Sequence, residues 1–392
     1  MNILPFQSKR SRSRQAKDYR QLHVAFSGGA TCGHLFPGVA VAEALLRRRP
    51  NTRITFVGNG RTRERNIIEG FGWQYIELAS QPAPTNPAAA WRFVADHVAS
   101  SRKASRLLDE QGVNAVVGLG GYASVPTARA AIARRIPLVL LEQNAVPGMA
   151  TRWLASRADH ICLAFAGAQA HLSTEAAISV SGNPVRRVFY SDLGSTVGDD
   201  AKRSGRQLLI LGGSGGAGQL NEQIPRALYK VRHLLAGWNV VHQAGNHGAV
   251  ATRSLYRKFQ IDAAVEPFIE DVAPLVRAAD LVICRAGGTT LAELAAAGAP
   301  AIMIPWSGAK DNHQRRNAET FARHESAAMI DPREVEGRLD NAIAATLSEL
   351  LPDRQRRLAM GVAISRHARP KAAQYVASTI TELVHAATRL AA

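Results

Sequence analysis

The sequence predicts an α/β protein of two domains, each built round a parallel β-sheet. Three observations predict it: the chain length, the alternation of apolar runs with helical stretches, and a strand, glycine loop and helix that occur twice. At 392 residues the chain is longer than one ordinary domain. Two domains of roughly 150–200 residues are therefore the natural expectation.

The strands are predicted from short runs rich in Val, Ile and Leu. Such runs, separated by stretches of helical length, are typical of buried parallel strands. After a first run at 22–26, the predicted strands are Ile54–Val57, Ala115–Leu119, Pro137–Leu141, His160–Ala164, Gln207–Leu211, Val240–His242, Leu281–Cys284 and Ala301–Ile304.

A polar segment divides this series into two halves. It reads SDLGSTVGDDAKRSGR at 191–206, and QLLILGGSGGAGQLN at 207–221 then repeats the strand, loop and helix of residues 22–46. We expect two Rossmann-like domains, 22–185 and 186–370, facing each other across a cleft. A last helix at about 371–392 is expected to pack back on the first domain.

The composition limits the classes of partner. The formal net charge of +17 favours anionic partners. Residues 1–21 carry +5 of it and are expected to form a disordered basic arm. Nucleic acid is not expected as a partner, because the chain contains no recognition module. No apolar stretch approaches the ~18–20 residues that span a bilayer, and three widely spaced cysteines indicate a reducing compartment without a disulfide framework.

The second glycine loop, Gly213–Gly218, matches the pattern G-x-G-x-x-G. Backbone amides of such a loop, together with the N-terminus of the following helix, bind a diphosphate. A nicotinamide cofactor also needs an acidic residue at the end of the next strand, to bind the ribose. That strand ends in His242-Gln243, and the matching strand of the first half ends in Gly58-Asn59. The sequence therefore argues against a dehydrogenase.

Glu293, in the segment CRAGGTTLAELAAAGAP at 284–300, is the candidate ribose ligand. A carboxylate has two acceptor oxygens and can bind both hydroxyls of a cis-diol. The alternative is structural, because Thr290 to Glu293 also fits a capping box at the start of a helix.

Seven segments in order resemble the MurG family of bacterial glycosyltransferases, which convert lipid I to lipid II. The resemblance covers about residues 22–385, and its segments are GGATCGHLFPGVAVAEAL, VVGLGGYASVP, LLEQNAVPGMATRWLA, SGNPVR, LGGSGGAGQLN, FIEDVAPLVRAADLVICRAGGTTLAELAAAGAPAIMIP and KDNHQRRNA. It implies a GT-B fold, with the donor UDP-N-acetylglucosamine on the C-terminal domain and the lipid acceptor on the N-terminal domain. It also implies an inverting transfer at the cytoplasmic face of the bacterial plasma membrane, with no cofactor. The absence of any D-x-D motif further argues against a metal-clamped diphosphate.

The resemblance also assigns site residues. It implies donor contacts at Thr31, Cys32, Gly33, Asn144, Arg186, Ser214, Ile269, Gly288, Thr289, Thr290, Leu291, Ala292, Glu293, Gln314 and Asn317. Among these, Arg186 and Ser214 lie near the diphosphate, Ile269 presents backbone to the uracil, and Gln314 and Asn317 contact the sugar.

His34 is the first candidate for the general base, since an imidazole with a pKa of about 6.5 is largely neutral at pH 7. The alternative is a ring that caps the helix start or binds the loop backbone. Glu142 is the second candidate, and Tyr122 is expected to position the acceptor. The chain departs from the family pattern at Ala30 and Cys32, and also at Val125 and Gly215; a positive φ at Ala30 or Cys32 would cost about 1–3 kcal/mol.

The segment 86–108 combines aromatic and basic residues in the region where the family meets the membrane. Trp91 and Phe93 accompany Arg92, Arg102 and Lys103, a combination that favours an anionic lipid surface. The alternative is an ordinary amphipathic helix with its aromatic residues in the core. For function as a whole, two alternatives stay open: a B-fold transferase with another lipid acceptor, and a non-catalytic protein that binds a nucleotide sugar.

Overall fold

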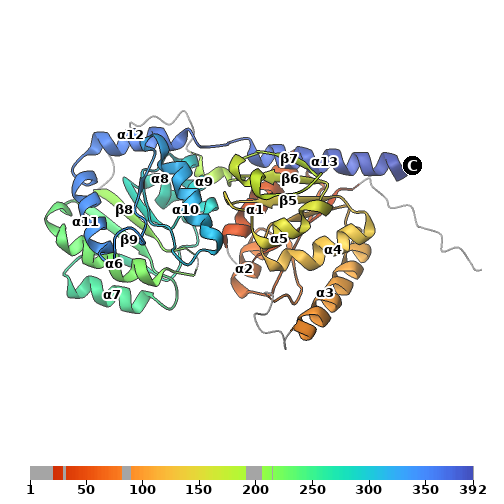
Figure 1. Cartoon of the computed structure of the whole chain (residues 1–392), viewed down its shortest axis with the longest axis horizontal. Helices are drawn as coiled ribbons and strands as arrows, with labels where there is room; N and C mark the ends of the chain where they lie inside the picture. Colours follow the sequence, from red (N-terminus) through yellow and green to blue (C-terminus); the bar gives the residue numbers. More distant parts are fainter. Residues whose placement is uncertain (1–20, 30–31, 82–89, 191–204, 214, 392) are drawn as a thin grey trace, which may run out of the picture.

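Two parallel sheets form the two domains of the chain (Figure 1). The computed structural model describes residues 21–29, 32–81, 90–190, 205–213 and 215–391. The first sheet has the order β3-β2-β1-β4-β5-β6-β7 and the second the order β10-β9-β8-β11-β12-β13. The strands are β1 His23–Ser27, β2 Arg53–Gly58, β3 Gln74–Glu77, β4 Ala115–Gly118, β5 Leu138–Glu142, β6 His160–Leu163 and β7 Ala177–Ser179, then β8 Arg206–Leu211, β9 Trp238–Gln243, β10 Ala264–Glu266, β11 Leu281–Cys284, β12 Ala301–Met303 and β13 Ala328–Met329.

Helices cover both faces of each sheet. In the first domain they are α1 Cys32–Arg48, α2 Thr62–Gly70, α3 Ala90–Glu110, α4 Val125–Arg134 and α5 Met149–Leu154. The second domain has α6 Gly218–Lys230, α7 Ala249–Lys258, α8 Ala273–Ala278, α9 Gly288–Ala297, α10 His313–Ala322, α11 Leu339–Leu350 and α12 Arg354–Ser365, and α13 Ala372–Ala391 ends the chain. The predicted fold class, two Rossmann-like domains, is confirmed.

Alternation along the central strands produces a core on each face of each sheet. In β1, Val24 and Phe26 pack in one cluster with α1, while Ala25 packs in another with α3 and α4. In β8, Leu208 and Ile210 face one cluster and Leu209 faces the other. Successive side chains of a strand point to opposite faces, so strands covered on both faces are apolar throughout.

The last helix returns to the first domain. Residues Val376, Ile380 and Val384 of α13 are buried in the cluster that contains β1 and α1, while α12 stays on the second domain, against α9 and α11. Figure 1 shows α12 and α13 lying one after the other along the same side of the two domains. Where the chain crosses between domains, Gly182 (φ +78°) packs closely against Arg369. A Cβ at this position would lie 2.4 Å from Cγ of Arg369, so the contact requires glycine.

Two departures from the family pattern carry no strain. Cys32 is the first residue of α1 and is not among the described residues with positive φ. Val125 has φ −63° and ψ −47°, an ordinary helical conformation. Ala30 lies outside the described residues. No helix in the described part of the chain is long and apolar enough to cross a membrane.

Candidate active site

A cavity of about 690 Å³ opens between the two domains. Its walls come mainly from the loops that follow β8, β9, β10, β11 and β12, and the first domain contributes Gly33 and Phe36 of α1. In both sheets the strand order reverses at the central strand, between β1 and β4 and between β8 and β11. Open α/β sheets bind ligands at this reversal, beyond the carboxyl ends of the strands.

The glycine loop after β8 forms one wall of the cavity. Gly216 has φ +76°, and a Cβ there would lie 2.3 Å from the carbonyl oxygen of Ala244, so only glycine fits. Gly213 also has positive φ, +82°. The loop leads into α6 at Gly218, which places backbone amides and a helix N-terminus at the cavity. This combination favours an anionic group.

Glu293 and Arg186 form a buried pair beside the cavity. The Arg186 Nη2 atom lies 3.7 Å from Glu293 Oε1, and the two side chains are only 10% and 13% exposed. Burial raises the pKa of Glu293 to about 7, although Arg186 opposes the shift. Among the described residues, Arg186 Nε and Nη2 have no hydrogen-bond partner. The guanidinium stacks 3.9 Å above the ring of Phe36, which lines the cavity.

The capping-box alternative for Glu293 is wrong. Helix α9 begins at Gly288, with Gly287 as its N-cap and no side-chain cap. Thr290 is therefore already the third helical residue, and Glu293 lies one turn further on. Its carboxylate faces Arg186 and the cavity instead of the helix start.

Arg285 is a cavity residue that the sequence analysis did not single out. It directly follows β11, and its guanidinium donates hydrogen bonds to the carbonyl oxygens of Ile304 (3.1 Å) and Pro305 (3.2 Å) and to Oε1 of Gln219 (3.2 Å). Burial lowers its pKa to about 10, which leaves it cationic at neutral pH. Its position between a buried strand and Gly287 was the available sequence signal.

His34 lies in the first turn of α1, next to Gly33 of the cavity wall. The ring packs on the backbone of Gly120, where a Cβ would lie 3.0 Å from Cδ2 of His34. Burial, together with the neighbouring His313, lowers the pKa of His34 to about 4. The imidazole is therefore neutral at pH 7.

Glu142, at the end of β5, directs its carboxylate to the loop that follows. It accepts hydrogen bonds from the backbone N–H groups of Asn144 (3.1 Å) and Gly148 (3.0 Å), and from the Asn144 amide. Burial raises its pKa. Tyr122 follows β4 at the same edge of the sheet, and its hydroxyl accepts a hydrogen bond from Nδ2 of Asn59 (3.2 Å).

The two domains touch at the start of α9. Thr289 donates a hydrogen bond to the carbonyl oxygen of Gly33 (2.5 Å). Gly288 lies so close to Gln143 that a Cβ would lie 1.8 Å from the Gln143 carbonyl oxygen. The fully buried Asn317 accepts from the Ala145 N–H (2.7 Å) and donates to Asn144 and to the Ala286 carbonyl.

Comparison with known proteins agrees with this geometry. Residues 24–163 match the glycosyltransferase family 28 N-terminal domain, and residues 207–376 match its C-terminal domain. A Geobacter sulfurreducens protein is 34% identical over 357 residues, which are 91% of this chain and 97% of that protein. It is named UDP-N-acetylglucosamine–N-acetylmuramyl-(pentapeptide) pyrophosphoryl-undecaprenol N-acetylglucosamine transferase. A protein of the same name from Stutzerimonas stutzeri is 35% identical, covering 93% of this chain and 99% of its own.

This chain belongs to the MurG family. The crystal structure of MurG from Acinetobacter baumannii is 29% identical, with a TM-score of 0.68, and the match covers 92% of this chain and 99% of that one. The GT-B arrangement expected for the family is therefore the one observed.

Six of the fifteen donor residues that the MurG resemblance predicts line the cavity. Residues that line the cavity are Gly33, Ile269, Thr289, Thr290, Glu293 and Gln314. Gly288, Leu291 and Ala292 belong to α9, but Leu291 is buried in the core. Asn144 and Asn317 bind each other between the domains and are not among the residues lining the cavity. Thr31 and Ser214 lie outside the described residues, and of Cys32 only the backbone is described.

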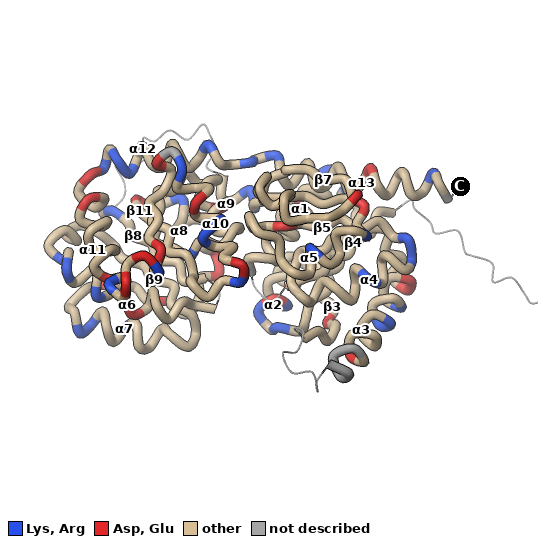
Figure 2. Tube along the Cα trace, in the orientation of Figure 1, with Lys and Arg blue, Asp and Glu red and all other residues tan. Residues whose placement is uncertain are grey.

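The predicted membrane residues belong to α3. Arg102 and Lys103 are exposed, and Figure 2 shows basic residues along α3 and α4. The side chains of Trp91, Arg92 and Phe93 lie outside the described part. In that part, no group of three or more His, Cys, Asp or Glu residues is placed to hold a metal ion.

Proposed function

We propose that this MurG-family chain transfers N-acetylglucosamine from UDP-N-acetylglucosamine to the 4-hydroxyl of the muramoyl sugar of lipid I, forming lipid II. The observation that carries the proposal is the cavity at the start of α6 and α9, with Glu293 and Arg186 beside it. It combines helix N-termini, a buried carboxylate and a buried cation, which together suit a sugar nucleotide.

The donor would lie along the second domain. The diphosphate meets the glycine loop before α6 and the start of α9, with Arg285 and Arg186 supplying positive charge. Glu293 accepts hydrogen bonds from the ribose diol, because a carboxylate offers two acceptor oxygens. The Ile269 N–H donates a hydrogen bond to Oε1 of Gln243 (3.1 Å). The backbone group of Ile269 that would contact the uracil is therefore its carbonyl oxygen, which accepts a hydrogen bond. Gln314, whose Oε1 accepts from the Trp306 N–H (3.0 Å), presents its NH₂ to the sugar.

Transfer then requires one displacement at the anomeric carbon. The acceptor oxygen forms the new bond to this carbon as the bond to the diphosphate oxygen breaks, so the configuration inverts. The electron pair leaves on UDP, and the amides, helix ends and arginines stabilise the developing charge.

We assign the base to His34 and loop positioning to Glu142. The half-buried imidazole is neutral at pH 7 and belongs to the first domain, so it can accept the hydroxyl proton. The Glu142 carboxylate is already bound by Asn144 and Gly148, which indicates a role in fixing their loop. We assign Tyr122 to orienting the acceptor, a role supported by the hydrogen bond from Asn59 that holds its hydroxyl.

Binding to an anionic membrane at the first domain follows from a surface formed by α3, α4 and α5. Trp153 and Met149 of α5 are 55% and 56% exposed, so this helix presents two large apolar side chains at the surface. The Arg129 guanidinium lies 5.6 Å from the Trp153 ring centroid, and His97 of α3 contacts the same ring. Apolar side chains flanked by cations suit a lipid interface.

The transfer is tested by measuring UDP release from UDP-N-acetylglucosamine with lipid I, with diacylglycerol and without acceptor. We expect release that depends on lipid I, a loss of at least a hundredfold in His34→Ala, and weakened donor binding in Glu293→Ala. Release with diacylglycerol alone would indicate a different lipid acceptor. Donor binding without release in any mixture would indicate a non-catalytic protein, and unchanged donor affinity in Glu293→Ala would contradict its ribose role.

Membrane binding is tested by co-sedimentation with anionic vesicles at low salt. Arg102→Gln combined with Lys103→Gln should weaken partitioning by up to about thirtyfold, since each cation near the surface contributes about 1 kcal/mol. The matched control is Arg257→Gln with Lys258→Gln on α7, two exposed cations of the second domain, which should have little effect. Equal losses in the two pairs would show that only net charge matters.

A further inference from the structure

Gln243 connects two walls of the donor cavity through one side-chain amide. Its Nε2 donates a hydrogen bond to the carbonyl oxygen of Gly213 (3.0 Å), in the glycine loop after β8. Its Oε1 accepts a hydrogen bond from the N–H of Ile269 (3.1 Å), in the loop after β10. The side chain lines the cavity and is only 6% exposed overall.

The orientation of this amide is fixed. Exchanging its oxygen and nitrogen would place an acceptor against the Gly213 carbonyl and a donor against the Ile269 N–H. The backbone of Gln243 is anchored too, because its carbonyl accepts from the Gly212 N–H (3.2 Å) and the strand pairs with Glu266 of β10. A rigid strand end thus holds one donor toward the glycine loop and one acceptor toward the Ile269 loop.

The residue before Gln243 makes the same strand end rigid from the core side. His242 Nε2 bonds to Oδ1 of Asn221 (3.1 Å), which can only accept, so this nitrogen carries the proton. Nδ1 then accepts from the Tyr256 hydroxyl (2.9 Å). Asn221 in turn donates to the carbonyl oxygen of Ala244 (2.8 Å), the atom on which Gly216 packs.

We propose that Gln243 is a positioning residue that sets the spacing between the diphosphate loop and the nucleobase loop, and thereby the affinity for a nucleoside diphosphate sugar. This inference rests on the donor site proposed above. Among the described residues, no other side chain forms hydrogen bonds to both loops. The two groups that would meet the ends of the nucleotide, at residues 213 and 269, are therefore held at a distance that one amide defines.

The test compares binding of UDP-N-acetylglucosamine to full-length variants by calorimetry. Gln243→Met removes both hydrogen bonds at nearly constant volume and should weaken binding about tenfold, because the Gly213 carbonyl and the Ile269 N–H lose the partner that positions them. Gln243→Glu keeps the shape but loses the donor while its carboxyl is ionised. When protonated, this carboxyl can donate to Gly213 and accept from Ile269 again, as the amide does. Relative to the unsubstituted protein at the same pH, binding by Gln243→Glu should therefore recover as the pH falls, whereas Gln243→Met should not recover.

The control is Gln207→Met at the opposite end of neighbouring strand β8, where the amide also donates to a backbone carbonyl, that of Leu275 (2.9 Å). It should change thermal stability but not donor affinity. Equal affinities of Gln243→Met and the unsubstituted protein would overturn this inference alone, as would a Gln243→Glu defect that is the same at every pH. If the unsubstituted protein did not bind the donor, the proposed donor site itself would fall.

Discussion

At the scale of single residues, the charge of Glu293 is the most informative property of the site. Its side chain is 13% exposed and lies 3.7 Å from the Arg186 guanidinium. An opposite charge normally lowers the pKa of a carboxyl, yet the pKa of Glu293 rises to about 7 because burial outweighs Arg186. Without ligand, ionised Glu293 is therefore unfavourable in its buried position. Hydrogen bonds from the ribose diol of a bound donor would stabilise the ionised carboxylate.

Glu293→Gln should stabilise the free protein at high pH while weakening donor binding. The pKa of Glu293 is about 7 in the folded protein, whereas an unperturbed glutamate has a pKa of 4.5. A raised carboxyl pKa contributes stability that is complete below pH 4.5 and is lost as the pH rises through 7. Between pH 4.5 and pH 8 the free energy of unfolding should thus shift in favour of the variant by up to about 3 kcal/mol.

Thermal melting of both proteins at pH 4.5 and pH 8, without ligand, measures this shift. The control is Glu349→Gln, an exposed carboxyl on α11, which should show little pH-dependent difference. If the difference in melting temperature between Glu293→Gln and the unsubstituted protein were the same at both pH values, the raised pKa of Glu293 would be contradicted.

His34 makes a second prediction about pH. With UDP-N-acetylglucosamine saturating, Glu293 is occupied, and kcat/KM for lipid I reports the base of the donor complex. Burial lowers the pKa of His34 to about 4 in the free chain, so the activity should change little between pH 8 and pH 5.5. A histidine with an ordinary pKa would lose about tenfold over that range. An acidic limb at pH 6.5 would argue against a buried His34 as the base.

At the scale of elements, the central strands were predictable and the outer ones were not. Runs such as 281–284 and 301–304 are apolar throughout because helices cover both faces of those strands. The strands β3, β7, β10 and β13 are the edges of the sheets and have only two to four residues. They contain exposed or half-buried positions such as Glu77 and Ala264, so no continuous apolar run identifies them.

The candidate site was predictable to the extent that it depends on loops that follow strands. Glu293, Ile269 and Gln314, which the family resemblance assigns to the donor, line the cavity. The bonds that Asn317 makes to Asn144 and Ala145 join residues more than 170 positions apart in sequence, and no local pattern encodes such pairs. Gln243 was missed for the same reason, because its partners Gly213 and Ile269 belong to other segments of the chain.

A substitution at Gly288, the first residue of α9, tests whether transfer requires the close contact between the two domains at this position. Alanine there meets no backbone strain, because the residue is helical and has no positive φ. Its Cβ would however lie 1.8 Å from the Gln143 carbonyl oxygen of the other domain. Gly288→Ala should therefore lower the transfer rate at least tenfold by holding the domains apart.

The readout for Gly288→Ala compares kcat/KM for lipid I with the affinity for UDP, which should change less because the proposed UDP site lies on the second domain. Gly70→Ala is the matched control, since a Cβ at this last residue of α2 meets nothing within 4 Å. Full activity in Gly288→Ala would mean that catalysis does not need this contact.

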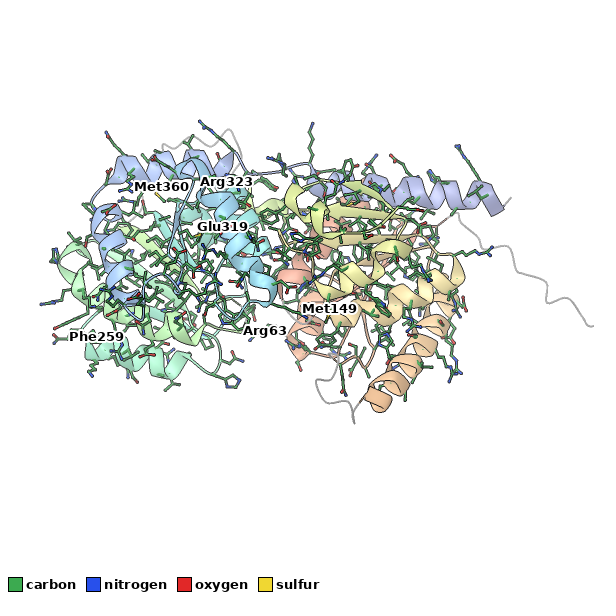
Figure 3. The ribbon with its side chains drawn as sticks, viewed as in Figure 1. Arg63, Met149, Phe259, Glu319, Arg323 and Met360 are labelled. Carbon is green, nitrogen blue, oxygen red and sulfur yellow. The ribbon has the colours of Figure 1, made fainter. Side chains whose placement is uncertain are left out.

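At the scale of the whole molecule, the domains meet on both sides of the cavity. Arg63 of α2 stacks 4.1 Å above the ring of Phe268 and donates to Asn246 (3.3 Å). On the other side, Arg152 pairs with Asp311, and Lys310 contacts the sulfur of Met149 (3.4 Å). Figure 3 shows Arg63 and Met149 where the domains face each other. Most of these contacts are made by exposed side chains, which contribute little energy each. The buried contact at Asn317 should therefore dominate closure.

Asn317→Ala distinguishes two roles for Asn317: holding the two domains together, called closure here, and binding the sugar of the donor. In the closure role, the variant leaves the Ala145 N–H and the Ala286 carbonyl without their partner, which should cost about 1–3 kcal/mol of stability. UDP and UDP-N-acetylglucosamine should then lose affinity by the same factor, and the radius of gyration in small-angle scattering should increase. In the sugar-reading role, only UDP-N-acetylglucosamine should bind more weakly. Asn341→Ala on α11, where the amide bonds only a surface lysine, should change none of these quantities. Because Asn317 is 0% exposed and its amide is bound at both ends, we expect the equal loss, and selective loss of the sugar nucleotide would reverse this assignment.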